Sequence, residues 1–222
     1  MLEALLEEAR HDENVIGVVL FGSRGRGVFV DERSDWDVYV VVREVRGDRP
    51  FRHGDRVETI ELTLEELGGA AGDRYHLAWL EPHLDKTGEV AAAMRAAVLV
   101  DPATAAQPLD AYVNSYYRSA KNARHDLALG SLLDALESIP HYLEFVFALH
   151  GRLRPYNKWL EWELREHPLP VEIDLARLER IGRTGALEDQ QALFRETEAL
   201  ARAHGHAATI DGWEPDVAWL RG

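Results

Sequence analysis

The sequence contains no cysteine. This absence excludes disulfide bonds, cysteine nucleophiles and thiolate metal sites, and it fits the reducing cytoplasm. Long apolar runs are also missing, since no stretch approaches the ~20 residues that a membrane-spanning helix needs. The opening segment, MLEALLEEARHDEN, indicates an acidic amphipathic helix rather than a signal peptide. We therefore expect a cytoplasmic protein that has no membrane partner.

Runs rich in lysine or arginine are absent as well. The chain has 25 lysine and arginine residues against 39 aspartate and glutamate residues, which gives a formal net charge of −14. Proteins that hold long nucleic acid by its backbone ordinarily have a basic patch, so this balance argues against long RNA or DNA. An acidic cleft would attract a cationic small molecule. Solubility alone explains the same excess equally well.

The composition is that of a soluble globular protein, and 222 residues suffice for two modest domains or one large one. Residues 90–100, VAAAMRAAVLV, indicate an apolar helix or a helix turning into a strand. The following segment, 101–110, contains two prolines and is a plausible boundary. Beyond it the apolar residues recur at helical spacing, in a long segment that is expected to break near Gly130.

The richest stretch of the chain is residues 21–42, FGSRGRGVFVDERSDWDVYVVV. It follows an apolar, β-branched run that predicts a buried strand ending at Gly22. Gly22 and Ser23 then form a turn in which glycine lets the backbone approach a phosphate closely. The next residues are expected to open a helix, whose free N–H groups favour an anion. Arg24 and Arg26 add positive charge.

Two carboxylates follow this turn. Asp35 and Asp37 alternate with apolar residues in the segment that ends at Val42, so a period of two places both on one face of a strand. Magnesium prefers such oxygen ligands and usually takes one or two protein carboxylates, with substrate phosphates and water completing its shell. A solvated strand edge is the alternative, but carboxylates in so apolar a strand are costly without a cation.

The Gly22-Ser23 turn and the SDWDV segment at 34–38 resemble the signature of the nucleotidyltransferase superfamily related to DNA polymerase β. The fuller string GSRGRG…SDWDVYV is similar to the small prokaryotic branch that holds aminoglycoside nucleotidyltransferases and minimal nucleotidyltransferases of toxin–antitoxin pairs. The resemblance implies an α/β (α+β) nucleotidyltransferase domain with a short mixed sheet, residues 1–104. An all-α helical-bundle domain that binds the substrate, residues 105–222, would follow.

The resemblance also implies a mechanism. Two Mg²⁺ ions on Asp35, Asp37 and a third acid would clamp the α-phosphate of ATP or another nucleoside triphosphate. A hydroxyl of a cationic small-molecule acceptor, for example of the aminoglycoside type, would attack in line, accept a nucleoside monophosphate, with AMP favoured, and release pyrophosphate. Such chemistry consists mostly of positioning and charge neutralisation.

The third acid should come from a neighbouring strand. Residues 56–64, RVETIELTL, alternate as a strand does and offer Glu58 and Glu61, which face opposite sides and cannot both be ligands. Glu58 is preferred because it follows an apolar residue, as in the V-E-V pattern of aminoglycoside-modifying relatives. Whichever glutamate is not the ligand is an ordinary strand residue that faces solvent.

Signals in the helical half are weaker. Lys158, beside aromatic residues that could stack on a base or sugar, is the first candidate to contact the triphosphate, and Lys121 is the second. A solvated helix face would explain either lysine. Relatives that modify aminoglycosides place a glutamate near the attacking hydroxyl, and Glu144 is the matching candidate for a general base. It could equally belong to the polar stripe of its helix.

Other activities remain open at this point. The protein could nucleotidylate another protein as an antitoxin or regulator, or it could sense a nucleotide without turnover. Arg118 and His125 fit the loose R-x(4–6)-H spacing of helical nucleases within one predicted helix, although the acidic balance disfavours RNA. Dimers are the commonest soluble oligomers, so a homodimer is the favoured assembly.

Overall fold

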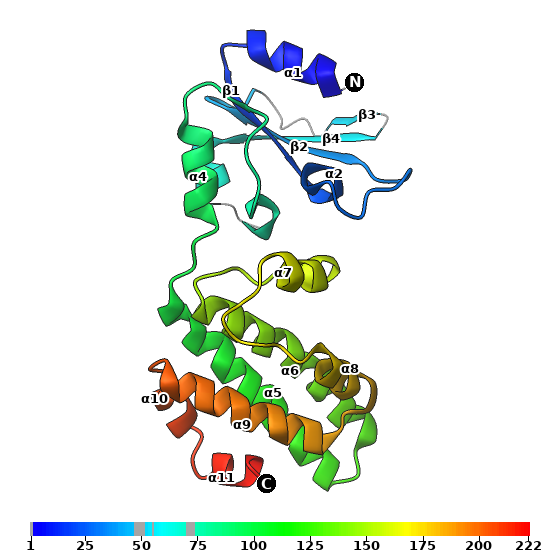
Figure 1. The fold of residues 1–222 in the computed structure, drawn as a ribbon, viewed down its shortest axis with the longest axis vertical. Coiled ribbons are helices and arrows are strands. Elements are labelled where there is room, and N and C mark those ends of the chain that lie inside the picture. The colour runs from blue at the N-terminus through cyan, green and yellow to red at the C-terminus, as the bar shows by residue number, and fades with distance from the viewer. Residues whose placement is uncertain (1, 47–51, 55, 70–73) are drawn as a thin grey trace. The chain divides into compact units, whose positions relative to one another are not determined.

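The computed structural model describes residues 2–46, 52–54, 56–69 and 74–222. They divide into two compact units, Met1–Leu99 and Val100–Gly222. The division falls just ahead of the proline-containing segment on which the sequence placed the boundary. The first unit combines a sheet with helices, and the regular elements described in the second are all helices, as the α/β and all-α fold classes predicted (Figure 1).

The first unit is built on a mixed sheet. Its described elements are α1 (Leu2–His11), β1 (Val15–Phe21), α2 (Gly22–Arg26), β2 (Trp36–Val42), β3 (Arg52–Gly54), β4 (Val57–Thr63), α3 (Leu64–Gly69), η1 (Arg74–Leu77), β5 (Leu84–Asp85) and α4 (Glu89–Ala97). The strand order is β3-β4-β2-β1-β5. β1 pairs antiparallel with β2 and β5, whereas β2 pairs parallel with β4. The expected mixed sheet is confirmed.

Both faces of this sheet are covered, because the alternating strand residues are apolar on each side. On one face, Val19 and Val41 pack with Leu67 of α3, Leu77 of η1 and Met94 of α4. On the other face, Val18, Leu20 and Val38 pack against α1 (Figure 1). Among the polar side chains on these strands, Thr59 of β4 is buried, whereas Asp37 and Glu58 are partly buried.

The second unit is a helical assembly around an aromatic core. Its described elements are η2 (Pro102–Ala105), α5 (Ala106–Arg124), α6 (Ala128–Leu149), η3 (Asn157–Trp159), α7 (Leu160–Glu166), α8 (Leu175–Thr184), α9 (Leu187–Ala203), α10 (Ala207–Asp211) and α11 (Asp216–Leu220). α5 and α6 form a hairpin whose buried side chains include Tyr112, Tyr116, Phe145 and Phe147. Phe194 of α9 packs on Tyr116, with ring centroids 5.5 Å apart.

The helix break expected near Gly130 is wrong by a few residues. α5 ends at Arg124 and α6 begins at Ala128, so Gly130 lies inside a helix. The chain turns at Asp126, whose φ is 55°, and the amide of Leu127 donates to the Asn122 carbonyl, 3.0 Å away. Gly130 serves a different purpose, because a Cβ there would lie 3.0 Å from Asn122 Nδ2.

Candidate active site

Three neighbouring strands present one row of side chains at the end of the sheet. Phe21 of β1 pairs with Asp37 of β2, and Asp37 pairs with Glu58 of β4. Residues directly opposite in adjacent strands share a face of the sheet, and adjacent strands lie only about 4.8 Å apart. The two carboxylates, both half-buried, therefore stand side by side on one face.

The glycine turn is pressed against one of these carboxylates. Gly22 has a φ of 65°, a conformation that side-chain-bearing residues rarely adopt. A Cβ at this position would lie 2.0 Å from Oδ2 of Asp37. Only a glycine leaves room for the turn and the carboxylate together, so the backbone of the Gly22-Ser23 turn directly borders the Asp37 carboxylate.

Asp35 lies one residue before β2 and is exposed, unlike Asp37. Its position two residues before Asp37 is in step with the strand period. The segment leading to it is held by Arg24, whose Nε donates to the Ser34 carbonyl at 2.9 Å and whose guanidinium lies 4.8 Å from the centroid of the Trp36 ring. Arg24, expected at the nucleotide, thus braces the residues on both sides of Asp35.

Arg26 has a comparable bracing role. Its two terminal nitrogens donate to the carbonyls of Tyr75 and Ala78, each at 2.6 Å. The guanidinium also stacks over the Tyr75 ring, 4.6 Å from its centroid. Arg26 therefore ties α2, which begins with the Gly22-Ser23 turn, to η1. The sequence had suggested only that this residue supplies charge for the phosphates.

Asp37 and Glu58 together form what we call the carboxylate row. The structure adds His76 to the neighbourhood of this row. Its ring stacks on Phe21 with centroids 5.2 Å apart, and Phe21 stacks on Tyr39 at 4.1 Å. His76 lies on η1, far from the glycine turn in sequence, so no motif or periodicity pointed to it. The Arg26 hydrogen bonds to η1 hold the segment that carries this ring.

Glu61, the alternative third acid, occupies a different position. It pairs with Val40 of β2, whose side chain belongs to the α1 face of the sheet. Glu61 therefore lies on the face opposite Asp37 and Glu58. Its Oε2 atom is buried and makes no hydrogen bond to the residues that the structure describes. This geometry favours Glu58 as the partner of Asp37.

The carboxylate row offers oxygen donors for a metal ion. Among the described residues, no group of three or more His, Cys, Asp or Glu side chains could hold a metal ion. Magnesium does not need such a group, since one or two carboxylates with phosphate oxygens and water complete its octahedral shell. The pair Asp37 and Glu58 fits this mode of binding, in which the nucleotide brings the remaining ligands.

The other predicted site residues belong to the second unit and lie on separate elements. Glu144 is a half-buried residue of α6 whose Oε2 lies 3.5 Å from Nδ1 of His141. Lys121 is exposed on α5, with Nζ 6.0 Å from the centroid of the Tyr117 ring. Lys158 is exposed on η3, with Nζ 5.3 Å from the centroid of the Trp159 ring.

The pair suggested for a helical nuclease does not share a helix. α5 ends at Arg124, and His125 is its C-terminal cap. Arg118 lies on α5 and forms ion pairs with Asp134, at 3.0 Å, and with Glu137 of α6. This arrangement explains Arg118 as a link between the two long helices.

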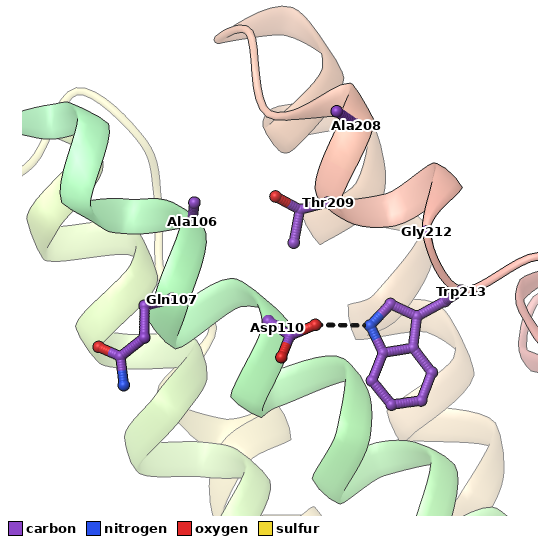
Figure 2. Close-up of a pocket in the computed structure, with 7 residues that line it drawn as sticks. All are labelled: Ala106, Gln107, Asp110, Ala208, Thr209, Gly212 and Trp213. Atoms are coloured by element: carbon purple, nitrogen blue, oxygen red, sulfur yellow. Dashed lines mark hydrogen bonds between the residues drawn. The ribbon is translucent and has the colours of Figure 1, made fainter.

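The second unit also has a surface groove between the start of α5 and α10, with a volume of about 720 Å³. Figure 2 shows the indole of Trp213 donating from Nε1 to Oδ1 of Asp110, at 2.8 Å. The remaining lining residues are Ala106, Gln107, Ala208, Thr209 and Gly212. None of the site residues predicted from the sequence lines this groove.

Comparison with known proteins bears on the first unit. Residues 2–79 match the family model described as a nucleotidyltransferase domain. No curated protein matches the chain. A solved structure, described as a nucleotidyltransferase-like protein from Exiguobacterium sibiricum 255-15, aligns with 89% of this chain and 78% of its own length, at 10% identity and a TM-score of 0.46.

The family match spans the glycine turn and the three carboxylates predicted as metal ligands, Asp35, Asp37 and Glu58. In the described residues no helix has the length and apolar character needed to cross a membrane. The first unit thus has the fold class, the turn and the acidic strand expected from the sequence. Residues 2–79, which include this site, therefore form a nucleotidyltransferase domain.

Proposed function

We propose that the protein is a magnesium-dependent enzyme that transfers AMP from ATP to a hydroxyl of a small cationic acceptor and releases pyrophosphate. The observation that carries the proposal is the row in which Asp37 and Glu58 stand in register beside Gly22. This row supplies hard oxygen ligands at a turn whose backbone a phosphate can approach.

The roles of the residues follow from their positions. Asp35, Asp37 and Glu58 would hold the divalent ions, whose charge offsets that of the triphosphate when they are bound. Gly22 leaves the backbone open to a phosphate, and Ser23 offers a hydroxyl donor. Arg24 keeps Asp35 in place through its bond to Ser34. In this proposal the first unit carries out the transfer.

The second unit, in the proposal, binds the acceptor and the outer phosphates. The acceptor oxygen attacks the α-phosphorus, the bond to the bridging oxygen of the β-phosphate breaks, and pyrophosphate leaves with the electron pair. Glu144 would take the proton of the hydroxyl, and Lys121 and Lys158 would contact the triphosphate. The net charge of −14 supports a cationic acceptor, such as an aminoglycoside-type antibiotic.

The test is release of pyrophosphate from each of the four nucleoside triphosphates, with and without Mg²⁺, against a panel of aminoglycoside, aminocyclitol and lincosamide antibiotics. We expect release that requires both Mg²⁺ and one acceptor. Asp37→Asn should abolish it with an unchanged melting temperature. Asp126→Asn, a conservative change in the turn between α5 and α6, should leave it intact.

Substantial turnover by Asp37→Asn would overturn the assignment of the carboxylate row. If no compound of the panel causes pyrophosphate release although the protein still binds a nucleoside triphosphate, the result would contradict a small-molecule acceptor. That result would favour a protein acceptor or a nucleotide sensor.

A further inference from the structure

Trp79, two residues after the end of η1, combines an exposed side chain with a strained backbone. Its φ is 62°, a conformation in which a bulky residue is a genuine outlier, and it is 53% exposed. Its neighbours Leu77 and Ala78 are only 3% and 8% exposed, and Leu80 packs against the core of the sheet. The run LAWL therefore buries its smaller side chains and leaves the largest one at the surface. Strain of this kind concentrates at functional sites, where the surrounding structure maintains it.

Arg26 fixes the backbone immediately before Trp79. Its guanidinium donates to the carbonyls of Ala78 and Tyr75, each at 2.6 Å, and hydrogen bonds from a charged donor are among the strong ones. The five residues of α2 begin at Gly22 and end at Arg26, so these two residues lie about 6 Å apart along the helix axis. The indole is therefore carried by a segment that is tied to the helix of the glycine turn.

A second contact connects the same segment to the carboxylate row. The ring of His76 stacks on Phe21 with centroids 5.2 Å apart, and Phe21 pairs with Asp37. Trp79 follows His76 by three residues, so one contact through Arg26 and another through His76 hold its segment beside the turn and the row. A nucleotide with its phosphates at the turn and the row has its base one sugar further out, a span comparable with the length of α2.

We propose that the indole of Trp79 is the platform on which the base of the bound nucleoside triphosphate stacks. This inference rests on the proposed function, which places the triphosphate at the carboxylate row. Stacking on an aromatic side chain is favourable for every base, because each base has a π face, and it does not read the hydrogen-bonding groups of the base. The larger ring system of a purine gains more contact with an indole than a pyrimidine does. Trp79 by itself therefore favours purine nucleotides and does not separate ATP from GTP.

The test compares the binding of ATP with that of tripolyphosphate, which has the three phosphates but no nucleoside, by calorimetric titration of the full chain with Mg²⁺ and without acceptor. We expect Trp79→Gly to weaken ATP binding about 10-fold, the effect of losing one stacked base, and to leave tripolyphosphate binding unchanged. Glycine relieves the strain of a positive φ, so the melting temperature should not fall. Trp79→Phe keeps a π face and should recover most of the affinity. Trp79→Leu keeps an apolar side chain without a π face and should not.

In the natural chain, ATP and GTP should bind more tightly than CTP and UTP, and Trp79→Gly should remove this difference. Leu129→Ala is the control, since Leu129 is 69% exposed on α6, and it should bind every ligand as the natural chain does.

Three results would overturn the stacking platform alone and leave the proposed transfer intact. They are an unchanged ATP affinity in Trp79→Gly, an equal loss of affinity for ATP and tripolyphosphate, and equal binding of purine and pyrimidine nucleotides by the natural chain. A natural chain that binds none of the four nucleoside triphosphates would overturn the proposed function itself, and this inference with it.

Discussion

Two glutamates on one short strand have opposite environments. Glu58 stands beside Asp37, whereas Glu61 faces the α1 side of the sheet with a buried oxygen that accepts no hydrogen bond from the described residues. A carboxylate that helps to bind magnesium is needed for turnover, but a carboxylate oxygen that is buried without a hydrogen bond is a cost to folding. The two residues therefore offer a matched pair of substitutions on the same element.

We expect Glu58→Gln to lower the rate of nucleotidyl transfer about 100-fold or more, because it removes a negative ligand oxygen beside Asp37. Glu61→Gln should retain the rate, with a melting temperature equal to or above that of the natural chain. Initial rates across a Mg²⁺ titration and thermal unfolding measure both effects. The reverse pattern, an inactive Glu61→Gln and an active Glu58→Gln, would show that the register does not decide which acid acts.

Individual site residues differ in how well the sequence predicts them. Asp35, Asp37 and the Gly22 turn follow from local pattern, because strand alternation and the conformational freedom of glycine are local properties. The geometry that favours Glu58 over Glu61 depends on the register between β2 and β4, which local alternation does not supply. His76 depends on tertiary packing alone, since it reaches the row from a separate 3₁₀ turn.

Among the elements, the side chain of Arg26 joins α2 to η1. Arg26 bonds two carbonyls of the η1 segment and stacks on buried Tyr75. We expect Arg26→Met to destabilise the protein by about 2 kcal/mol, because it removes hydrogen bonds donated by a charged group to carbonyls that stay partly buried. The transfer rate should fall because His76 and the glycine turn lose their common support.

Chemical denaturation and separate measurement of kcat and KM test this role of Arg26. Arg26→Lys should recover part of the stability, and Arg33→Met, an exposed control in the following loop, should change neither quantity. If Arg26→Met instead weakens nucleotide binding while the unfolding free energy stays the same, the guanidinium acts on the phosphates rather than on η1.

At the scale of the elements, the sequence predicts the strands more accurately than it predicts the ends of the helices. β1, β2 and β4 lie where runs of β-branched residues predicted them, since each strand has an apolar side facing a covered face of the sheet. The break between α5 and α6 was misplaced because Gly130 suggested a turn. The structure turns instead at Asp126, a residue type that tolerates the left-handed conformation, and α6 continues through Pro140. Helix packing overrides these local preferences.

At the scale of the whole molecule, ion pairs with arginine neutralise part of the acidic excess. Many carboxylates are bound by arginines, and Glu198 of α9 is among the most buried of these, with only 8% of the residue exposed. It accepts hydrogen bonds from Nε of Arg221 at 2.8 Å and from Nε of Arg202 at 2.9 Å. Arg202 also binds Asp211 of α10. Glu198 and Arg202 thus link α9 to α10 and to Arg221, which follows α11.

The hydrogen bonds from Arg221, and to a lesser extent those from Arg202, hold the pKa of Glu198 below its ordinary value near 4.5. A depressed pKa means that the unfolded chain takes up the proton first, so the stabilisation is present above about pH 4.5 and is lost as the pH falls further. We expect Glu198→Gln to cost about 1–2 kcal/mol at pH 7, or about 2–8 °C in melting temperature for a chain of this size.

The difference in melting temperature between the natural chain and the Glu198→Gln variant should shrink as the pH is lowered from 5 to 3. The natural chain then loses the charge that the variant never had. Thermal unfolding of the full chain at half-unit pH steps measures the difference, with Glu188→Gln on the exposed side of α9 as the control that should match the natural chain at pH 7. A gap that stays constant from pH 7 to pH 3 would mean that Glu198 stabilises the unit by packing rather than by charge.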